Sequence, residues 1–414
     1  MGADTGTTDA DIAIIGGGVI GCSIAHEFAP DHDVVVIDAD RIAGGTTGHA
    51  SGLISIVQDW KPEFEAARYA IEFFRAFDGT AEFSFTERPS IRLATAAGVE
   101  TAREIADAVG AAGFEATYLS AEGLNARFPD VFDLETFVGG TVFEDTGWVD
   151  PYTYTMALKR SAETDGARFV IGTPVTDIRT DNDGDAITGV ETTAGMIDAT
   201  RVVAAAGHRT RELLAELVTV PTRPFRYQTV NLAVDREIDA TYPVGWERLS
   251  RLYWRPEHNG ELHVGGGPYF VDEPESRASG PTTAFRRLVA ERIPHYLHGV
   301  DDARIVGGAT CPSGDAASPD GYPIVGTPAS APDGLVVATG MHGLGIMGSP
   351  VVARAVRATV TGEAAPFDTT FLDPDRFGTT PPAIESSYIE ETPNAWRPDA
   401  REWIADPDAE PASD

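Results

Sequence analysis

Lysine is almost absent from this 414-residue chain, which contains only Lys61 and Lys159. Arginine therefore carries nearly all of the positive charge, and acids outnumber bases by 64 to 31, which gives a formal net charge of -33. The acids are spread along the chain, and such a surface disfavours binding to nucleic acids and anionic membranes. At molar salt the Debye length falls to about 3 Å, which screens self-repulsion. The composition therefore predicts a halophilic, haloarchaeal-like protein, with an acidic protein of ordinary salt as the alternative.

Cysteines and long apolar runs are also scarce. Cys22 and Cys311 cannot form a disulfide framework or a four-ligand zinc site, and we expect no metal. No window approaches the roughly 18 apolar residues that a membrane helix needs, and residues 1–10 lack the charged and apolar segments of a signal peptide. These absences predict a cytoplasmic protein without an integral membrane segment. We expect its tails, residues 1-8 and 379-414, to be disordered.

The strongest motif that is present lies between residues 11 and 38. A short apolar run meets glycines in the G-x-G-x-x-G spacing, a helical pattern follows, and a second apolar run ends in an acid. Gly16 permits the strand-to-helix turn, Gly18 lets the backbone approach a pyrophosphate, and Gly21 allows close helix–strand packing. Asp38 is placed to accept hydrogen bonds from an adenosine ribose and disfavours a 2'-phosphate. The motif therefore predicts FAD or NAD rather than NADP.

The next loop, Gly-Thr-Thr-Gly-His-Ala-Ser-Gly-Leu at residues 45–53, is rich in small and hydroxyl side chains that suit a flat cofactor. Together with the fingerprint it resembles the FAD-dependent D-amino-acid-oxidase superfamily (glycine/sarcosine oxidase type), and most of all the flavin domain of the dimethylglycine and sarcosine dehydrogenases. The resemblance covers about residues 9–378. It includes Ser-Pro-Asp-Gly-x-Pro-Ile-Val-Gly at 318–326 and Gly-Met-His-Gly-Leu-Gly at 340–345. It favours FAD over NAD.

The resemblance implies an α/β fold of mixed α+β character, in which a discontinuous Rossmann-like FAD-binding domain is joined to an antiparallel-sheet substrate domain. The FAD-binding domain is expected at residues 9-85, 140-220 and 300-378, and the substrate or cap domain at 86-139 and 221-299. Longer alternating strands in the last of these ranges fit that assignment. Locally, Asp150 followed by Pro151 predicts the start of a helix.

His49 occupies the position that carries the flavin covalently in the dehydrogenases, and a polar loop histidine that only contacts FAD is the alternative. Some oxidases attach flavin through a cysteine near the C-terminal signature, but the spacing from Cys311 is too long for this. A helix that starts after the 340–345 turn would direct its positive end at the flavin and stabilise the anionic reduced form. The motifs matched to the family predict these cofactor contacts: Gly16, Gly18, Val19, Ile20, Gly21, Asp38, Ala39, Arg41, Thr46, Thr47, His49, Ala50, Ser51, Gly52, Val175, Ala206, Gly207, Gly340, His342, Gly343, Leu344, Gly345 and Ile346.

Catalytic residues are expected on and beside a strand that begins at Leu252, because the dehydrogenases have a similar Tyr-x-Arg strand. Arg255 would hold a substrate carboxylate bidentately, and Tyr253 or His263 could take the amine proton. An ordinary surface-alternating strand is the alternative. Monomeric sarcosine oxidases have a lysine that holds the carboxylate where this chain has Met347, so either Arg255 or another arginine takes that role here, or the substrate has no carboxylate.

We therefore expect an FAD-dependent oxidoreductase that oxidises a secondary or tertiary amine or amino acid, of the sarcosine, dimethylglycine or glycine type, to an imine by hydride transfer to flavin N5. A dehydrogenase is favoured over an oxidase, because neither lysine matches the oxygen-activating position of related oxidases. The candidate electron acceptors are an electron-transfer flavoprotein, a quinone and O2. A 2-hydroxy-acid or glycerol-phosphate dehydrogenase and a non-catalytic electron-relay flavin subunit stay open as alternatives. The sequence leaves the substrate and the oligomeric state open.

Overall fold

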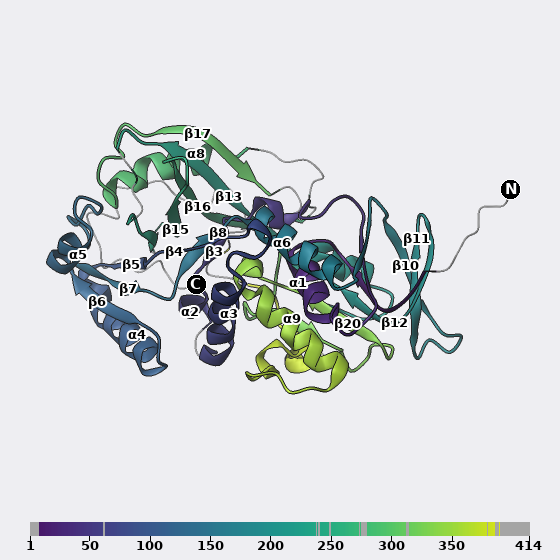
Figure 1. Cartoon of the computed structure of the whole chain (residues 1–414). Coiled ribbons are helices and arrows are strands. Elements are labelled where there is room, and N and C mark those ends of the chain that lie inside the picture. The colour runs from purple at the N-terminus through teal and green to yellow at the C-terminus, as the bar shows by residue number, and fades with distance from the viewer. Residues whose placement is uncertain are drawn as a thin grey trace.

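The computed structural model of the chain contains a mainly parallel sheet under helices and, beside it, a larger mainly antiparallel sheet (Figure 1). The structure describes residues 8–60, 63–236, 238, 241–247, 250–272, 274, 280–311, 314–378, 380–385 and 389. Most of the tails expected to be disordered, residues 1–7, 379, 386–388 and 390–414, lies outside this described part. No helix in the described ranges has the length and apolar character that crossing a membrane requires.

The first sheet has the strand order β10-β11-β12-β1-β2-β9, and β20 and β19 continue it beside β12. Strands β20, β12, β1, β2 and β9 are joined in parallel. Valine and isoleucine runs in β1 and β2 are buried on both faces, as parallel strands under helices require. The strands are β1 (Thr8–Ile15), β2 (Val34–Asp38), β9 (Arg168–Ile171), β10 (Val175–Thr180), β11 (Ile187–Thr192), β12 (Gly195–Ala204), β19 (Ile324–Gly326) and β20 (Leu335–Thr339).

Four helices accompany this sheet: α1 (Val19–Phe28), α3 (Phe64–Phe77), α6 (Pro151–Thr164) and α9 (Gly345–Thr361). Helix α1 packs against both α6 and α9, so most of its circumference is apolar and buried. Cys22 on α1 is fully buried, as a small apolar side chain would be. The predicted start of α6 is confirmed, because the Asp150 side chain accepts a hydrogen bond from the Thr153 N–H at 2.7 Å and Pro151 begins the helix.

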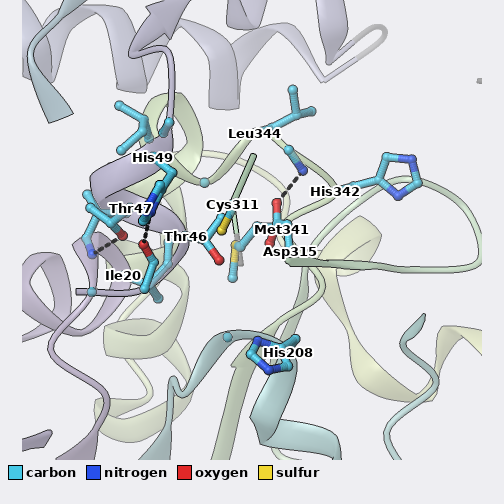
Figure 2. Close-up of a pocket in the computed structure, with 18 of the residues that line it drawn as sticks. Ile20, Thr46, Thr47, His49, His208, Cys311, Asp315, Met341, His342 and Leu344 are labelled. Carbon is cyan, nitrogen blue, oxygen red and sulfur yellow. Dashed lines mark hydrogen bonds between the residues drawn. The ribbon is translucent and has the colours of Figure 1, made fainter. Parts of the chain in front are cut away.

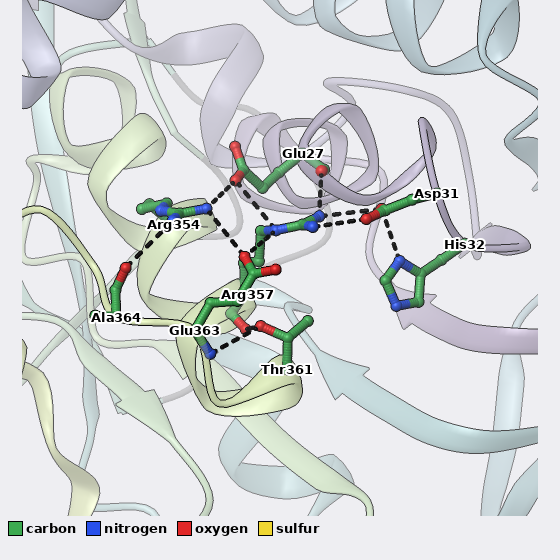
Figure 3. Close-up of polar contacts among 8 residues, drawn as sticks. All are labelled: Glu27, Asp31, His32, Arg354, Arg357, Thr361, Glu363 and Ala364. Atoms are coloured by element: carbon green, nitrogen blue, oxygen red, sulfur yellow. Dashed lines mark hydrogen bonds and ion pairs between the residues drawn. The ribbon is translucent and has the colours of Figure 1, made fainter.

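Ion pairs join the C-terminal ends of α1 and α9 (Figure 3). The Arg357 guanidinium donates to both oxygens of Asp31, at 3.1 and 2.6 Å, and to Glu363 at 3.1 Å. Arg354 donates to Glu27 at 3.2 Å. Arginines near the ends of helices also interact favourably with the exposed carbonyl groups there. The hydrogen bond from Arg357 lowers the pKa of the Asp31 carboxyl below its usual value.

The second sheet has the order β17-β13-β16-β15-β14-β5-β7-β6, with β18 also paired to β13. Every pair is antiparallel except β14 with β5. Its apolar core surrounds the fully buried Trp254. The strands are β5 (Ser90–Ala94), β6 (Ala116–Ser120), β7 (Gly139–Phe143), β13 (Arg223–Ala233), β14 (Val244–Glu247), β15 (Leu252–Pro256), β16 (Leu262–Phe270), β17 (Arg304–Thr310) and β18 (Asp315–Ala317).

The remaining elements connect the two sheets or cover the second one. Helices α4 (Val99–Ala111), α5 (Ala121–Arg127) and α8 (Thr283–Arg292) accompany the second sheet. A small sheet of β3 (Leu53–Ile54), β8 (Gly147–Val149) and β4 (Phe85–Glu87), with α2 (Ile56–Asp59) and α7 (Thr210–Leu213), completes the set of α-helices and strands. The mixed α/β class is confirmed. The division into two domains stays a prediction, and β17 and β18 pair with the second sheet although their residues fall in a range expected for the FAD-binding domain.

Candidate functional site

A cavity of ≈ 1100 Å³ lies between the carboxyl ends of β1, β2 and β12 and one face of the second sheet. This exceeds the roughly 300–1,000 Å³ of pockets for drug-sized ligands, so it has room for an extended ligand and a small substrate. Figure 2 shows part of the wall, where the loop with Thr46, Thr47 and His49 lies opposite Met341 and Leu344. Parallel α/β sheets bind ligands at this end of their strands.

The fingerprint has the backbone geometry that its glycines predicted. Gly16 has a φ of +116°, and a Cβ there would lie 2.4 Å from the Ala205 carbonyl oxygen. A Cβ on Gly21 would lie 1.9 Å from the Gly16 carbonyl oxygen, so strand and helix touch through backbone alone. The Asp38 carboxylate accepts hydrogen bonds from the Gly17 N–H at 2.6 Å and the Asp40 N–H at 2.8 Å. These contacts fix the acid at the edge of the cavity.

The loop after β2 lies along the cavity and is tied to helix α1. The Thr47 hydroxyl oxygen accepts from the Val19 N–H at 3.0 Å, and the Thr46 hydroxyl donates to the Gly314 carbonyl. His49 lies in the cavity wall, and its Nδ1 is 3.1 Å from the Gly45 carbonyl oxygen. Because a carbonyl only accepts, Nδ1 donates this hydrogen bond, which leaves Nε2 directed away from it.

The structure brings most of the predicted cofactor residues together in the cavity wall. The exceptions are Gly21, Arg41 and Gly340, which do not line it. Gly21 acts through helix packing, and Gly340 has a positive φ of +71° in the turn after β20. The other predicted contacts line the cavity from Asp38 and Val175 at one end to Ile346 at the other.

The glycine turn between β20 and α9 is held by a buried carboxyl group. Asp315 Oδ2 accepts from the Gly343 N–H at 2.6 Å, and Oδ1 accepts from the Ala316 N–H at 2.8 Å (Figure 2). Burial raises the pKa of Asp315 to about 6. The first N–H groups of α9 follow directly, and they have no partner within their own helix, which makes this end suitable for an electron-rich ligand edge.

Three side chains on neighbouring strands form a row on the sheet face of the cavity. Trp246 of β14 is in register with Arg92 of β5 and with Tyr253 of β15, and all three line the cavity. Arg92 lies over the Trp246 ring at 4.7 Å and is 3.7 Å from the Asp59 carboxylate. We call Arg92, Trp246 and Tyr253 the sheet row. Since residues in register share a face, the row follows from strand pairing.

Tyr227 joins the sheet row to the glycine turn. A Cβ on Gly343 would lie 2.6 Å from the Tyr227 ring, and the rings of Tyr227 and Tyr253 are 6.4 Å apart. The ring of Tyr253 in turn lies over Gly265, where a Cβ would come within 2.2 Å. The Tyr227 ring therefore lies between the sheet row and the glycine turn that precedes α9.

Two of the three predicted catalytic residues lie behind the wall rather than in it. Arg255 is 5% exposed, donates to the Ser51 carbonyl at 2.7 Å and pairs with Glu257 at 3.0 Å. His263 is buried and reaches the Ser51 hydroxyl, at 2.9 Å from Nε2. Tyr253 alone of the three lines the cavity. Alternation along β15 puts Arg255 on the same face as Tyr253, so the difference comes from the loop at Ser51, which bonds to both Arg255 and His263 and lies between them and the cavity.

Arg92 and Trp246 were not predicted as site residues. A period-2 pattern in β5 carried the signal for Arg92, since Ile91 and Leu93 are core residues while Ser90 and Arg92 line the cavity. Nothing local marked Trp246, because its place depends on β14 pairing between β5 and β15.

The cysteines and lysines occupy different surroundings. Cys311 lies in the cavity wall near Asp315 and Met341 (Figure 2). Lys159 lies on α6, away from the cavity wall, and pairs with Glu163 at 2.5 Å. The other lysine, Lys61, is outside the described residues.

The cavity fits FAD in three respects. Asp38, the acid expected to bind a ribose, lies at one end, and the glycine turn and the start of α9 lie at the other. Between them, Gly45 lines the cavity and a Cβ there would meet no protein atom within 4 Å, so protein packing alone does not call for a glycine. Asp38, Thr47 and the α1 N-terminus would hold the nucleotide half, and the 340–345 turn would hold the flavin.

The comparisons with known proteins agree with this geometry. The model of the family described as FAD dependent oxidoreductase (DAO) matches residues 11–359. Human mitochondrial dimethylglycine dehydrogenase is 27% identical over 409 residues, which cover 91% of this chain and 46% of that protein. The 4-methylaminobutanoate oxidase (formaldehyde-forming) of Paenarthrobacter nicotinovorans is 26% identical over 392 residues, which cover 89% of this chain and 46% of that protein.

Solved structures show the same fold. Glycine oxidase from Geobacillus kaustophilus has a TM-score of 0.78 at 22% identity, covering 89% of this chain and 99% of that chain. L-proline dehydrogenase from P. horikoshii has a TM-score of 0.80 at 23% identity, covering 90% and 98%. The chain spans less than half the length of the two curated relatives above. The family match, which runs from the glycine fingerprint to the last turn of α9, confirms the predicted resemblance: the chain belongs to the FAD-dependent oxidoreductase (DAO) family, with FAD as its cofactor.

Proposed function

We propose that this chain oxidises a secondary or tertiary amine that carries a carboxylate, of the sarcosine or dimethylglycine type, to the imine, which water then hydrolyses. The observation that carries the proposal is the sheet row of Arg92, Trp246 and Tyr253, which faces the glycine turn at the flavin end of the cavity. The row combines a cation with aromatic surfaces, which are the groups needed for a small methylated amino acid.

Arg92 is proposed to bind the carboxylate. Its guanidinium lies in the wall, supported by the Trp246 ring at 4.7 Å and by Asp59 at 3.7 Å, and its side chain is 23% exposed. A planar guanidinium matches a carboxylate with two parallel hydrogen bonds. Arg255, for which the sequence predicted this role, lies outside the cavity wall, where it donates a hydrogen bond to the Ser51 carbonyl and pairs with Glu257.

Tyr253 and Tyr227 are proposed to surround the amine end. Aromatic faces attract methylated ammonium groups, and the Tyr253 hydroxyl can accept a hydrogen bond from the amine. Bound FAD supplies the hydride acceptor for the carbon–hydrogen bond next to the nitrogen. The chain's own part is to orient the substrate between Arg92 and Tyr253 and to exclude water from that end of the cavity.

The names of two relatives support the substrate class. Dimethylglycine and 4-methylaminobutanoate both combine an N-methyl amine with a carboxylate. For the electrons we propose transfer to an electron-transfer flavoprotein or a quinone rather than to O2, because Lys159 lies outside the cavity wall. We also propose that the protein acts in the cytoplasm and, through its surface charge, avoids nucleic acids.

Anaerobic titration of the FAD-loaded protein tests the proposal. Sarcosine or dimethylglycine should bleach the flavin absorbance, and Arg92→Gln should raise the Kd for these substrates about 10- to 100-fold, since one charge-assisted pair is lost. Arg127→Gln, which removes an arginine paired with Glu144 on the surface, is the matched control and should bind normally.

Other results would point elsewhere. Bleaching by 2-hydroxy acids or glycerol phosphate, with none by amines, would replace the proposal with the hydroxy-acid alternative. No bleaching by any of these compounds, in a protein that binds FAD, would favour an electron-relay subunit. An unchanged Kd in Arg92→Gln would remove Arg92 from the carboxylate site.

A further inference from the structure

A continuous chain of hydrogen bonds runs from the cavity wall into the second sheet. The Tyr253 hydroxyl is 2.7 Å from the Ser51 hydroxyl, which is 2.9 Å from His263 Nε2. His263 Nδ1 is 2.9 Å from Asn231 Oδ1, and Asn231 Nδ2 donates to Glu261 at 3.2 Å. Ser51 belongs to the loop of residues 45–53, and the other residues lie on or beside three neighbouring strands, β13, β15 and β16.

The direction of each hydrogen bond follows from the carboxylate at the inner end. Glu261 can only accept, so the Asn231 amide turns its NH2 group toward Glu261 and its oxygen toward His263. The facing nitrogen, Nδ1, must then carry the ring proton. Nε2 is left with a lone pair and accepts from the Ser51 hydroxyl, whose oxygen in turn accepts from the Tyr253 hydroxyl.

Burial is the main cause that keeps the His263 ring neutral. Burial, followed by the nearby Arg255 guanidinium, lowers the pKa of His263 to about 3. Glu257 has one oxygen 3.8 Å from Nδ1, but its other oxygen pairs with Arg255 at 3.0 Å. A neutral ring with its proton on Nδ1 presents only an acceptor to Ser51. The histidine is therefore not a store for a substrate proton.

We propose that Asn231, His263 and Ser51 are positioning residues that turn the Tyr253 proton inward, so that the Tyr253 oxygen faces the cavity as a hydrogen-bond acceptor and favours substrates with an N–H group there, which a secondary amine has and a tertiary amine has when protonated. An acceptor there stabilises an amine or ammonium and repels a carboxylate, which fixes the direction in which an amino-acid substrate enters. The selection of substrates rests on the proposed amine oxidation. The direction of the hydrogen bonds from Tyr253 to Glu261 does not depend on it.

The first test reads the ring directly and needs no activity. In protein labelled with ¹⁵N-histidine, with the signal of His263 assigned by its loss in His263→Phe, the two nitrogens should show the neutral Nδ1–H form throughout pH 5–8. A proton on Nε2, or a positively charged ring in that range, would overturn the assignment of direction, whatever the enzyme's substrate.

The second test asks whether Ser51 and His263 position Tyr253 through the same series of hydrogen bonds. In stopped-flow reduction of the FAD-loaded protein, Ser51→Ala and His263→Phe should each lower the limiting rate about 10- to 100-fold, as expected for a misplaced reacting group. The substrate Kd, set at Arg92, should change much less. The double variant should be no slower than the slower single variant, and Ser51→Thr, which keeps the hydroxyl, should recover most of the rate.

His258→Gln is the matched control, because His258 is exposed, its ring centroid lies 4.5 Å from that of Trp148 in a tilted arrangement, and it is not part of the hydrogen-bond chain. Full activity in Ser51→Ala with normal FAD content, or multiplied losses in the double variant, would refute a positioning role. If no amine reduces the flavin of the wild-type protein, the proposed function fails. The NMR result then decides by itself whether the hydrogen bonds run in the inferred direction.

Discussion

At the residue scale, the site depends on which nitrogen or oxygen of each side chain is already engaged. His49 and His263 both use Nδ1 to meet a carbonyl-type oxygen, the Gly45 backbone oxygen and the Asn231 amide oxygen, and both leave Nε2 directed away from that oxygen. The surroundings then separate their roles. His49 faces the cavity from a loop, whereas His263 is buried in a sheet.

His49 gives a prediction at this scale. Its free Nε2 in the cavity wall suits the covalent flavin link that the family resemblance implies. We expect the yellow colour to stay with wild-type protein after acid precipitation, and to pass to the supernatant in His49→Ser. The control His298→Gln changes an exposed histidine and should keep the colour in the pellet. Colour released from the wild-type protein would reduce His49 to an ordinary contact.

At the element scale, helices and strands were predictable where their signals are local. Asp150 and Pro151 marked the start of α6, which the structure confirms. The pairing of elements was not predictable in this way. Strand β14 lies parallel to β5 although more than a hundred residues separate them, and that pairing brings Arg92 beside Trp246.

The contact between α1 and α9 gives the prediction for this scale. Arg357→Gln removes a two-bond pair with Asp31, whose side chain is 46% exposed, and should lower the free energy of unfolding by about 1 kcal/mol. Arg287→Gln is the control, because Arg287 is exposed where it pairs with Glu291, and it should leave the free energy of unfolding nearly unchanged. Denaturant titration measures both.

The same pair has a defined pH dependence. Because Arg357 lowers the folded-state pKa of Asp31, the pair stabilises the protein fully above the unfolded-state value of about 4 and loses this contribution as the pH falls further. The difference between wild type and Arg357→Gln should therefore narrow in acid. A difference that is constant from neutral pH down to pH 2 would show that Asp31 is not the partner that matters.

At the scale of the whole molecule, charge is the dominant property. With a net charge of -33, the folded chain repels itself at low salt, and screening removes much of this cost at high salt. We expect the Tm to rise by several kelvin between about 0.1 M and about 3 M KCl, and NaCl to have the same effect at equal ionic strength, since screening does not distinguish the two cations. A Tm that does not change with salt would reject the halophilic interpretation and indicate an acidic protein adapted to ordinary salt concentrations.

The sequence by itself determined the family and the cofactor, because the fingerprint, the His49 loop and the 340–345 turn are contiguous motifs whose chemistry is local. The tertiary structure alone decided which polar groups reach the substrate. It placed Arg255 behind the wall and Arg92 in it, and it brought Ser51 next to His263, which is 212 positions away in the chain. The physical reason is that strand pairing brings Arg92 beside Trp246 while the loop at Ser51 covers Arg255, and both arrangements depend on contacts between segments that are far apart in the sequence.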